Sequence, residues 1–523
     1  MDFENKTNHT DITFIGSGIS SSFTILHFLD RLKTKSIHKK ISITIIDKYP
    51  EFYTGIPYGV RSGFSVLLIT SLKNFLPEPE LGKFIKWLNI NKEWLLEEFR
   101  SDGGILSAEW LSKHADKLKN NEWEDLFIPR RFFGCYIDQK TKKYIEEAEE
   151  KGSIVVDYVN TEVIDIDKTD TMYSLSLNND HKLISKKVIL SVGSLPTVHL
   201  WKKEDFITDD NLIFVNNPYK PCLKEVLAKL DTFLEDQPEK EVNALIVGAN
   251  ASGLEMLYKL NDHGNIKSKI NKFTLLSTQG LSPDSIVDEE GKKKYLPKNL
   301  LSLADHQSLT AKQIADATYK DLDLADEIHL GAASTVDIIS KAFGSLLKKL
   351  DQGELKKFAC LYGNDIGRRQ RCAGYHYSKT IEALKEENRF DHIAGRFIDI
   401  KKNSDDMYSL EYLDTRSGTN RISKDSVQIV FNCIGSTNLT ASDIPQLLKN
   451  TIEKKLCIPN ESKIGFDVNE SLEASDNLHI VGPLLAGNIF EGKAVWHVEH
   501  CGRIIWLSNV LSDKIYDFFS QSK

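Results

Sequence analysis

Two glycine-containing segments have residue types and spacing that suit binding of the phosphates of a dinucleotide. In the first segment, Gly16, Gly18 and Ser21 follow an apolar run that ends at Ile15. Glycines at such a turn let backbone N–H groups approach a pyrophosphate at the start of the next helix. Asp47 ends the following apolar run, and an acid at that place accepts hydrogen bonds from ribose hydroxyls. Ser21 replaces the glycine that packs the helix against the strand, where another small residue fits.

The second segment repeats this pattern with two departures. Gly248 and Gly253 flank Asn250, which stands at the second glycine position, so the backbone has less room to approach a diphosphate. The apolar run 272–277 ends without an acid, which suits the 2′-phosphate of NADPH, although no arginine follows it. We therefore expect NADPH, with NADH possible. The alternative is a unit of this shape that binds no nucleotide.

Each glycine-containing turn needs a strand–turn–helix–strand unit to position it. Runs of the length and apolar composition of buried strands occur at 11–15, 41–47, 242–247 and 272–277. Apolar residues recur at helical spacing at 23–32 and 254–260. The sequence therefore predicts an α/β protein with two Rossmann-like dinucleotide-binding domains.

Two further strand-like runs, which end at Gly193 and Gly435, bracket the second unit. Their similarity indicates equivalent places on either side of an inserted domain. We place the parts of the chain as follows: a first domain at 1–210 that is completed by 426–523, and a second domain at 211–425 with a helical insertion at about 281–390. Within that insertion, Arg368, Arg369 and Arg371 could meet an anionic group or form a solvated face.

Composition excludes several other classes of protein. Of the 523 residues, 41% are hydrophobic and 27% charged, and the net charge of −8 shows no long block of one sign. We therefore expect a globular protein without a nucleic-acid partner. The first residues are polar, and no run of about 18 apolar residues occurs, so we expect a cytoplasmic protein that makes no use of a membrane. The sequence leaves the oligomeric state open.

The seven cysteines are scattered and never spaced as CxxC or as metal ligands. We therefore expect no disulfide scaffold, no metal site and no dithiol reductase. The pattern His-Val-Glu-His at 497–500 also lacks the spacing of a zinc-binding helix.

Together these motifs resemble the flavoproteins with two dinucleotide-binding domains, most closely the FAD/NAD(P)-binding group related to flavin-dependent monooxygenases and FAD-dependent urate hydroxylase. The resemblance covers nearly the whole chain and is thin at 281–390. It implies that the first turn binds FAD through Gly16, Gly18 and Ser20, with Asp47 toward the ribose. It further implies flavin-side contributions from positions that match other family motifs: Gly55, Arg130, Arg131, Gly482 and Pro483.

The resemblance also places the segment after Gly482 close to the flavin ring. On a helix, His497 and His500 are three residues apart and share a face, so a histidine there could bind substrate or shuttle a proton at neutral pH. The alternative is a helix cap with aromatic packing around Trp496. Glu491 could contact substrate or flavin, or it could be the N-terminal charge of a helix.

The resemblance implies an FAD-dependent oxidoreductase that uses NAD(P)H. We expect a monooxygenase that hydroxylates a small organic substrate with oxygen, through a flavin–oxygen adduct. Two alternatives stay open. One is an oxidoreductase that passes electrons to an acceptor other than oxygen, and the other is a flavin-binding regulatory protein without turnover.

Overall fold

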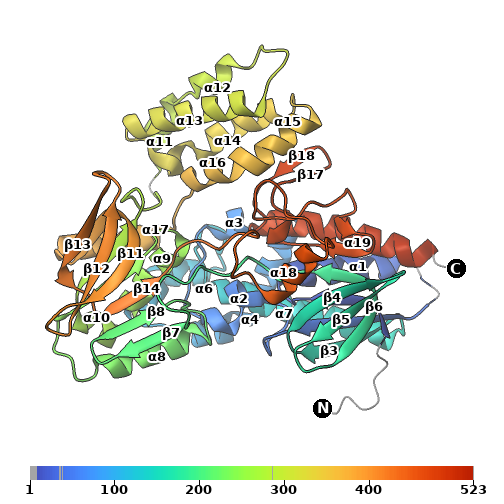
Figure 1. Ribbon diagram of the computed structural model, residues 1–523, viewed down its shortest axis with the longest axis horizontal. Coiled ribbons are helices and arrows are strands. Elements are labelled where there is room, and N and C mark those ends of the chain that lie inside the picture. Colours follow the sequence, from blue (N-terminus) through green and yellow to red (C-terminus); the bar gives the residue numbers. More distant parts are fainter. Residues whose placement is uncertain (1–8, 35–36, 38, 286, 522–523) are drawn as a thin grey trace.

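The computed structural model describes residues 9–34, 37, 39–285 and 287–521 (Figure 1). Two β-sheets with their helices lie side by side, and a separate group of helices stands above them in this view. The polar residues 1–8, on which the expected location partly rests, lie outside the described residues. Within the described part of the chain, no helix is both long and apolar enough to cross a membrane.

The first sheet has five parallel strands in the order β16-β6-β1-β2-β3. Isoleucines and valines fill these strands because both faces of the sheet are covered by other elements. Antiparallel strands β15, β4 and β5 extend the sheet. The bounds are β1 (His9–Ile15), β2 (Ile41–Asp47), β3 (Ile154–Asn160), β4 (Val163–Thr169), β5 (Met172–Leu177), β6 (Lys182–Leu190), β15 (Glu473–Ser475) and β16 (Leu478–Ile480).

Helices from both ends of the chain cover this first sheet. The last helix, α19 (Cys501–Gln521), packs along α1 (Ile19–Thr34), and α7 (Arg130–Glu150) packs on the same α1. The remaining helices of this domain are α2 (Gly55–Tyr58), α3 (Leu72–Phe75), α4 (Glu80–Asp102), α5 (Ile105–Lys113), α6 (Ala115–Lys119) and α18 (Gln446–Glu453). The first domain is thus built from two distant parts of the chain.

The second sheet has the order β13-β12-β11-β10-β9-β14-β8-β7, with β11, β10, β9, β14 and β8 parallel. Its strands are β7 (Phe206–Asp209), β8 (Leu212–Val215), β9 (Val242–Val247), β10 (Ile270–Ser277), β11 (Phe390–Lys402), β12 (Tyr408–Asp414), β13 (Thr419–Ser426) and β14 (Ile429–Asn432). Its helices are α8 (Leu223–Leu234), α9 (Ala251–Asp262), α10 (Gly264–Lys269) and α17 (Tyr375–Glu386).

The second sheet extends beyond the predicted limits of 211–425 at both ends. Strand β7 precedes that range, and β14 follows it, yet β14 pairs with β8 and β9 in the middle of the sheet. The reason is that backbone hydrogen bonding decides sheet membership, whereas the sequence-based limits followed the glycines that end strand-like runs.

A helical body stands apart from both sheets (Figure 1). It is an insertion in the connection between β10 and β11 and has an apolar core of its own, around Ile314, Ile339, Phe343 and Phe358. Its helices are α11 (Glu289–Lys294), α12 (Lys298–Ser302), α13 (Ala311–Glu327), α14 (Gly331–Leu347), α15 (Gln352–Lys357) and α16 (Gly363–Arg369). The body is shorter than the predicted 281–390 because α17 packs on α9 of the second domain instead.

Candidate active site

The first glycine-rich turn connects β1 to α1. Gly16 has φ +92°, and a Cβ added there would lie 2.5 Å from the backbone oxygen of Ser191, so this turn requires glycine. The Ser21 hydroxyl donates to the Gly16 carbonyl at 2.6 Å and lies 2.6 Å from the Ser191 hydroxyl. Ser21 is fully buried. Its hydroxyl therefore holds the turn together and is not open to a cofactor.

Asp47 lies at the end of β2, beside this turn. One carboxylate oxygen accepts hydrogen bonds from the backbone N–H and the hydroxyl of Ser17, at 2.8 and 2.9 Å. The other accepts the backbone N–H of Tyr49 at 2.9 Å. The side chain is only partly buried, which leaves room for a ribose hydroxyl. No acidic residue occupies the first turn of α1, where free N–H groups favour an anion. These features fit the ADP part of FAD.

Glycines from three segments that are distant in sequence meet at the start of α1. A Cβ added at Gly55, which has φ +62°, would lie 3.4 Å from the Cα of Gly18. A Cβ added at Gly482, which has φ +86°, would lie 2.8 Å from the hydroxyl oxygen of Ser20. Pro483 follows Gly482 and opens a short 3₁₀ turn. The structure therefore brings Gly18, Ser20, Gly55 and Gly482 together at one edge of the first sheet.

The second turn has the same geometry between β9 and α9. Gly248 has φ +110°, and a Cβ added there would lie 2.3 Å from the backbone oxygen of Cys433, which follows β14 as Ser191 follows β6. A Cβ added at Gly253 would lie 1.9 Å from the Gly248 oxygen. Asn250 caps α9 by accepting the Gly253 N–H at 3.3 Å. The turn is therefore folded as a dinucleotide-binding turn in spite of Asn250.

The strands that end near Gly193 and Gly435 lead into two linkers between the domains. The linkers pair with each other at Thr197 and Ser436, and the Thr437 N–H donates to the Pro196 carbonyl at 2.8 Å. No heavy atom lies within 4 Å of a Cβ added at Gly193 or Gly435, so both glycines border open space. The two strand ends are therefore equivalent places in the two sheets, joined by a double connection.

Arg130 and Arg131 both make ion pairs inside the protein. The two terminal nitrogens of Arg130 donate to the carboxylate of Glu255 on α9 at 2.7 and 3.0 Å, so this pair joins the two domains. Arg131 donates to Glu51 at 2.6 Å and to the Tyr58 carbonyl at 2.9 Å. Arg130 therefore links α7 to the second domain, and Arg131 positions the segment from Glu51 to Tyr58 beside the first turn. Their expected contact with the cofactor stays a prediction.

The segment that carries Trp496, His497 and His500 is not helical, contrary to the spacing argument made from the sequence. Strand β18 (Lys493–Val495) ends before it, and α19 begins after it at Cys501. The two histidines therefore do not share a helical face. The reason is that a hairpin formed by β17 (Asn488–Phe490) and β18 delivers an extended connection to the start of α19.

Burial also lowers the pKa values of both His497 and His500. Burial lowers the pKa of His497 to about 3, and the positive charge of Arg503 adds to this. Burial lowers the pKa of His500 as well. Both imidazoles are therefore neutral at pH 7, and a proton shuttle with a pKa near 7 does not apply to them. Glu491 lies in the exposed hairpin turn and accepts the Trp506 indole N–H at 3.0 Å.

Trp496 fixes the helical body to the first domain. Its ring lies in the core of that body, 5.8 Å from Phe358 and 6.1 Å from Phe343 between ring centroids. Glycines at 363 and 367 make room for it, since a Cβ at Gly363 would lie 2.6 Å from the indole. The aromatic packing that the sequence offered as an alternative therefore describes Trp496.

A group of charged residues lies beside His497, and one of them, Arg503, was not singled out from the sequence. Arg503, in the first turn of α19, donates to the His497 carbonyl at 2.8 Å and lies 3.2 Å from its Nδ1. Arg371 and Glu499 complete the group, because the charge of Arg371 acts on the pKa values of both His497 and Glu499. The sequence indicated Arg371 as a possible contact for an anion, but it gave no signal that Arg371 lies near His497 and Arg503, because Arg371 comes from the connection after the helical body.

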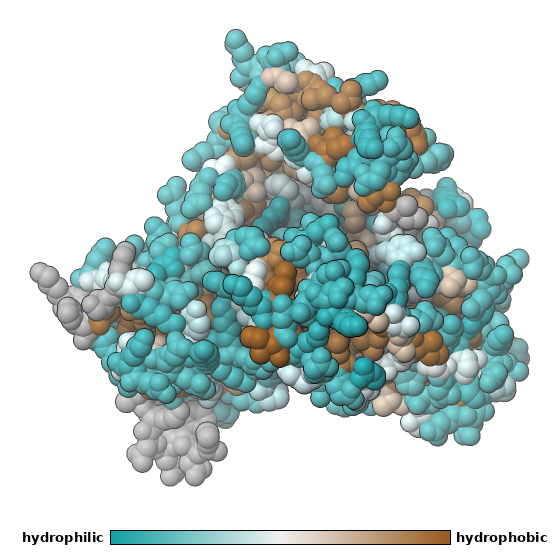
Figure 2. All heavy atoms as spheres, turned by 180° about the vertical axis from the view of Figure 1, so that it is seen from behind, coloured by the Kyte–Doolittle hydropathy of each residue, from teal (hydrophilic) through white to brown (hydrophobic). Residues whose placement is uncertain are grey.

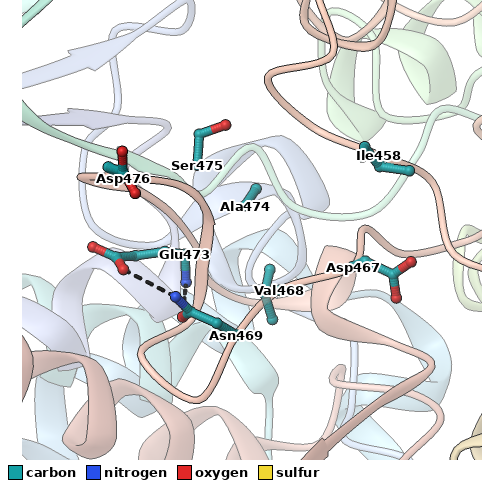
Figure 3. A pocket seen from close by; sticks show the side chains of 8 residues that line it. All are labelled: Ile458, Asp467, Val468, Asn469, Glu473, Ala474, Ser475 and Asp476. Atoms are coloured by element: carbon teal, nitrogen blue, oxygen red, sulfur yellow. Dashed lines mark hydrogen bonds between the residues drawn. The ribbon is translucent and has the colours of Figure 1, made fainter.

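A separate depression of about 410 Å³ lies on the edge of the first sheet (Figure 3). Its side chains bond to one another, since the Asn469 amide donates to Glu473 at 3.1 Å. The lining residues are Ile458, Asp467, Val468, Asn469, Glu473, Ala474, Ser475 and Asp476. None of the residues predicted to bind a cofactor or substrate lines it.

Residues 13–195, which contain the first turn and Asp47, match a family described as FAD-NAD(P)-binding. Together with the two folded turns, this match is consistent with an FAD/NAD(P)-binding flavoprotein. The uncharacterized protein Rv3403c of Mycobacterium tuberculosis is 27% identical over 508 residues, which are 96% of this chain and 94% of that protein. The uncharacterized protein YdhS of Escherichia coli is 22% identical over 52% of this chain and 46% of that protein.

Solved structures share the fold at low sequence identity. The L-lysine 6-monooxygenase from Pseudomonas syringae has a TM-score of 0.53 and 13% identity, and the match covers 98% of this chain and all of that chain. The ornithine N-hydroxylase of Kutzneria sp. 744 has a TM-score of 0.51 and 11% identity, over 98% of this chain and 99% of that chain. The predicted fold class, an α/β protein with two Rossmann-like domains, is therefore confirmed.

Proposed function

We propose that this protein is an NAD(P)H-dependent flavin monooxygenase that hydroxylates a small organic substrate. The observation that carries the proposal is the pair of glycine turns. In each turn, the first glycine lies close to the backbone of the residue that follows the neighbouring parallel strand. Bound FAD would accept a hydride from NAD(P)H and, once reduced, pass electrons to oxygen. Structures titled as lysine and ornithine hydroxylases share this fold, which supports oxygen as the acceptor.

The protein's own contribution would be to position the two nucleotides relative to each other. Direct contacts lead from the first turn to the second: Gly18 lies beside Gly55 of α2, the Tyr58 carbonyl contacts α7, and Arg130 of α7 binds Glu255 of α9. Because the two turns are joined through packed elements, bound nucleotides would keep a fixed relation to each other.

Two other functions would need different observations. Transfer of electrons to a disulfide substrate would require a reactive thiol pair, but no two cysteines have CxxC spacing, and burial raises the pKa of Cys433 and Cys501. A regulatory protein without turnover would be expected to have a distorted second turn, whereas Gly248 and Gly253 fold it tightly. Both observations favour the monooxygenase.

We expect the purified protein to be yellow and to lose its visible flavin absorbance when NADPH is added without oxygen. The paired turns provide the reason, since each would bind one nucleotide and packed elements join the two turns. Anaerobic spectra before and after NADPH addition check this. Flavin that neither NADPH nor NADH bleaches would favour the regulatory alternative, and incorporation of oxygen-18 from gas into product would separate the monooxygenase from other oxidoreductases.

Arg416 is expected to favour NADPH over NADH. The hydroxyl of Thr415 donates to the Thr278 carbonyl at 2.7 Å, which brings the β12–β13 turn beside the end of β10, where a 2′-phosphate would lie. We expect Arg416→Gln to raise the KM for NADPH about tenfold, because one charge-assisted hydrogen bond to the phosphate would be lost. The KM for NADH should stay unchanged. Steady-state kinetics with both cofactors measure this.

The control for this prediction is Arg421→Gln in the neighbouring strand. Arg421 is already paired with Asp414 at 2.9 Å, so its loss should not change either KM. Equal effects of Arg416→Gln on both cofactors would contradict the assignment.

A further inference from the structure

The group of charged side chains beside His497 carries more positive than negative charge. Three guanidinium groups, those of Arg368, Arg371 and Arg503, accompany the single carboxylate of Glu499. Within the described residues, none of the three has a carboxylate within 4.0 Å. By contrast, Arg369 on the same helix α16 pairs with Asp323 at 2.7 Å and with Asp326 at 2.8 Å.

Packing of the helical body brings these side chains together. A Cβ added at Gly367 would lie 3.5 Å from the Trp496 indole nitrogen and 3.9 Å from the His497 ring. Arg368 and Arg371 follow Gly367 by one and four residues, so the end of α16 faces the extended segment that leads to Arg503. The guanidinium of Arg503 lies 4.9 Å from the centre of the Trp496 ring.

These groups line a recess rather than a flat surface. Solvent reaches Arg371 and Glu499, and yet burial among surrounding atoms lowers the pKa of Arg371 and raises the pKa of Glu499. The surface is hollowed between the helical body and the rest of the molecule (Figure 2). Guanidinium groups without a carboxylate within 4.0 Å among the described residues can, in such a place, donate hydrogen bonds to an anion.

The recess lies beside the first dinucleotide turn. Cys501, two residues before Arg503, has its sulfur 3.4 Å from the Tyr58 hydroxyl of α2, and α2 begins at Gly55 next to Gly18. Further along α19, the Ser508 hydroxyl donates to the Ser20 carbonyl at 3.1 Å. A ligand in the recess would therefore be next to a dinucleotide bound at the first turn.

We propose that Arg371 and Arg503 bind the carboxylate group of a small organic substrate in this recess. Arginine presents a planar fork of donors that matches a carboxylate, and Arg503 has donors left beside the one that bonds to His497. The cationic end of an amine would meet repulsion from three guanidinium groups. The inference relies on the proposed function only in calling the ligand a substrate.

Binding is to be measured on the full-length protein with its flavin, by isothermal titration calorimetry at constant ionic strength. The probes are succinate and benzoate as carboxylates, inorganic phosphate as a different anion, and cadaverine as a cation. We expect at least one carboxylate to saturate the protein, and we expect Arg371→Gln and Arg503→Gln each to weaken that binding about tenfold or more. Arg371→Lys, which keeps the charge and loses the fork, should weaken binding less.

Arg369→Gln is the matched control, because Arg369 ends α16 two residues before Arg371 and is already paired with two aspartates. It should leave carboxylate binding unchanged. Failure of both carboxylates to bind, tighter binding of phosphate or cadaverine, or carboxylate binding that survives Arg371→Gln and Arg503→Gln would each overturn the proposal. Flavin content and melting temperature of each variant identify any that fail to fold.

The same variants separate this inference from the proposed function. Arg371 lies in the connection after α16, outside both glycine turns, so anaerobic reduction of the flavin by NADPH should proceed in Arg371→Gln as in the unchanged protein. If NADPH bleaches the flavin but carboxylates do not bind, only the substrate inference fails. If carboxylates bind through the two arginines but NADPH does not bleach the flavin, only the proposed function fails.

Discussion

Gly16→Ala is expected to leave the protein without FAD. The added Cβ would meet the backbone oxygen of Ser191 at 2.5 Å, and alanine is strained at φ +92°. Strain of about 1–2 kcal/mol in the left-handed region and about 1–3 kcal/mol from overpacking combine to weaken FAD binding about 100-fold. The visible flavin absorbance per protein after purification, and a titration with added FAD, measure this loss.

Gly253→Ala is the informative counterpart, because its Cβ would lie 1.9 Å from the Gly248 oxygen in the second turn. This variant should keep its flavin and lose reduction by NADPH. Gly344→Ala, at a helical position with no atom within 4 Å of the added Cβ, should change neither property. Normal FAD content in Gly16→Ala would contradict the assignment of the first turn.

Arg130→Ala is expected to lower the free energy of unfolding by about 3–5 kcal/mol. The substitution removes the charged partner of the Glu255 carboxylate, whose side chain is 5% exposed. The hydrogen bond from the Tyr219 hydroxyl, at 2.7 Å, would remain. An unpaired buried charge is far more costly than an absent pair. Urea unfolding, followed by tryptophan fluorescence and by flavin release, measures the change. The pair joins α7 to α9, so both signals should shift together.

Two comparisons test the physical cause of that loss. Arg130→Met combined with Glu255→Gln leaves no buried charge and should recover most of the stability. Lys73→Ala removes an exposed partner of Asp125 at 2.7 Å and should cost less than about 1 kcal/mol. If Arg130→Ala and Lys73→Ala were equally mild, the interdomain ion pair would not stabilise the protein.

Local pattern was enough to predict the two glycine turns. Strand, turn and helix at β1–α1 and β9–α9 follow from residues within about 20 positions of one another, and backbone conformation at Gly16 and Gly248 depends on such short-range signals. The same holds for the equivalence of the strand ends near Gly193 and Gly435. Asp47 beside the first turn was also accessible to this reasoning, since it ends the next strand.

Spacing alone failed where long-range contacts decide the backbone. The segment from Trp496 to His500 has residues that suit a helix, but the hairpin before it and the insertion of Trp496 into the helical body hold it extended. The neutral state of His497 follows from burial and from the charge of Arg503. Neither of these can be predicted from the adjacent residues in the sequence. Arg130 likewise finds its partner Glu255 about 125 residues away.

The sequence by itself determined the class of this protein, because each dinucleotide turn is a local unit whose glycines are required by the backbone. Only the tertiary structure decided the composition of the candidate substrate site. Arg371 and Arg503 come from the connection after α16 and from the start of α19, and the docking of Trp496 brings them near each other. Side chains so far apart in sequence become neighbours through packing. Short-range periodicity in the sequence does not predict such contacts.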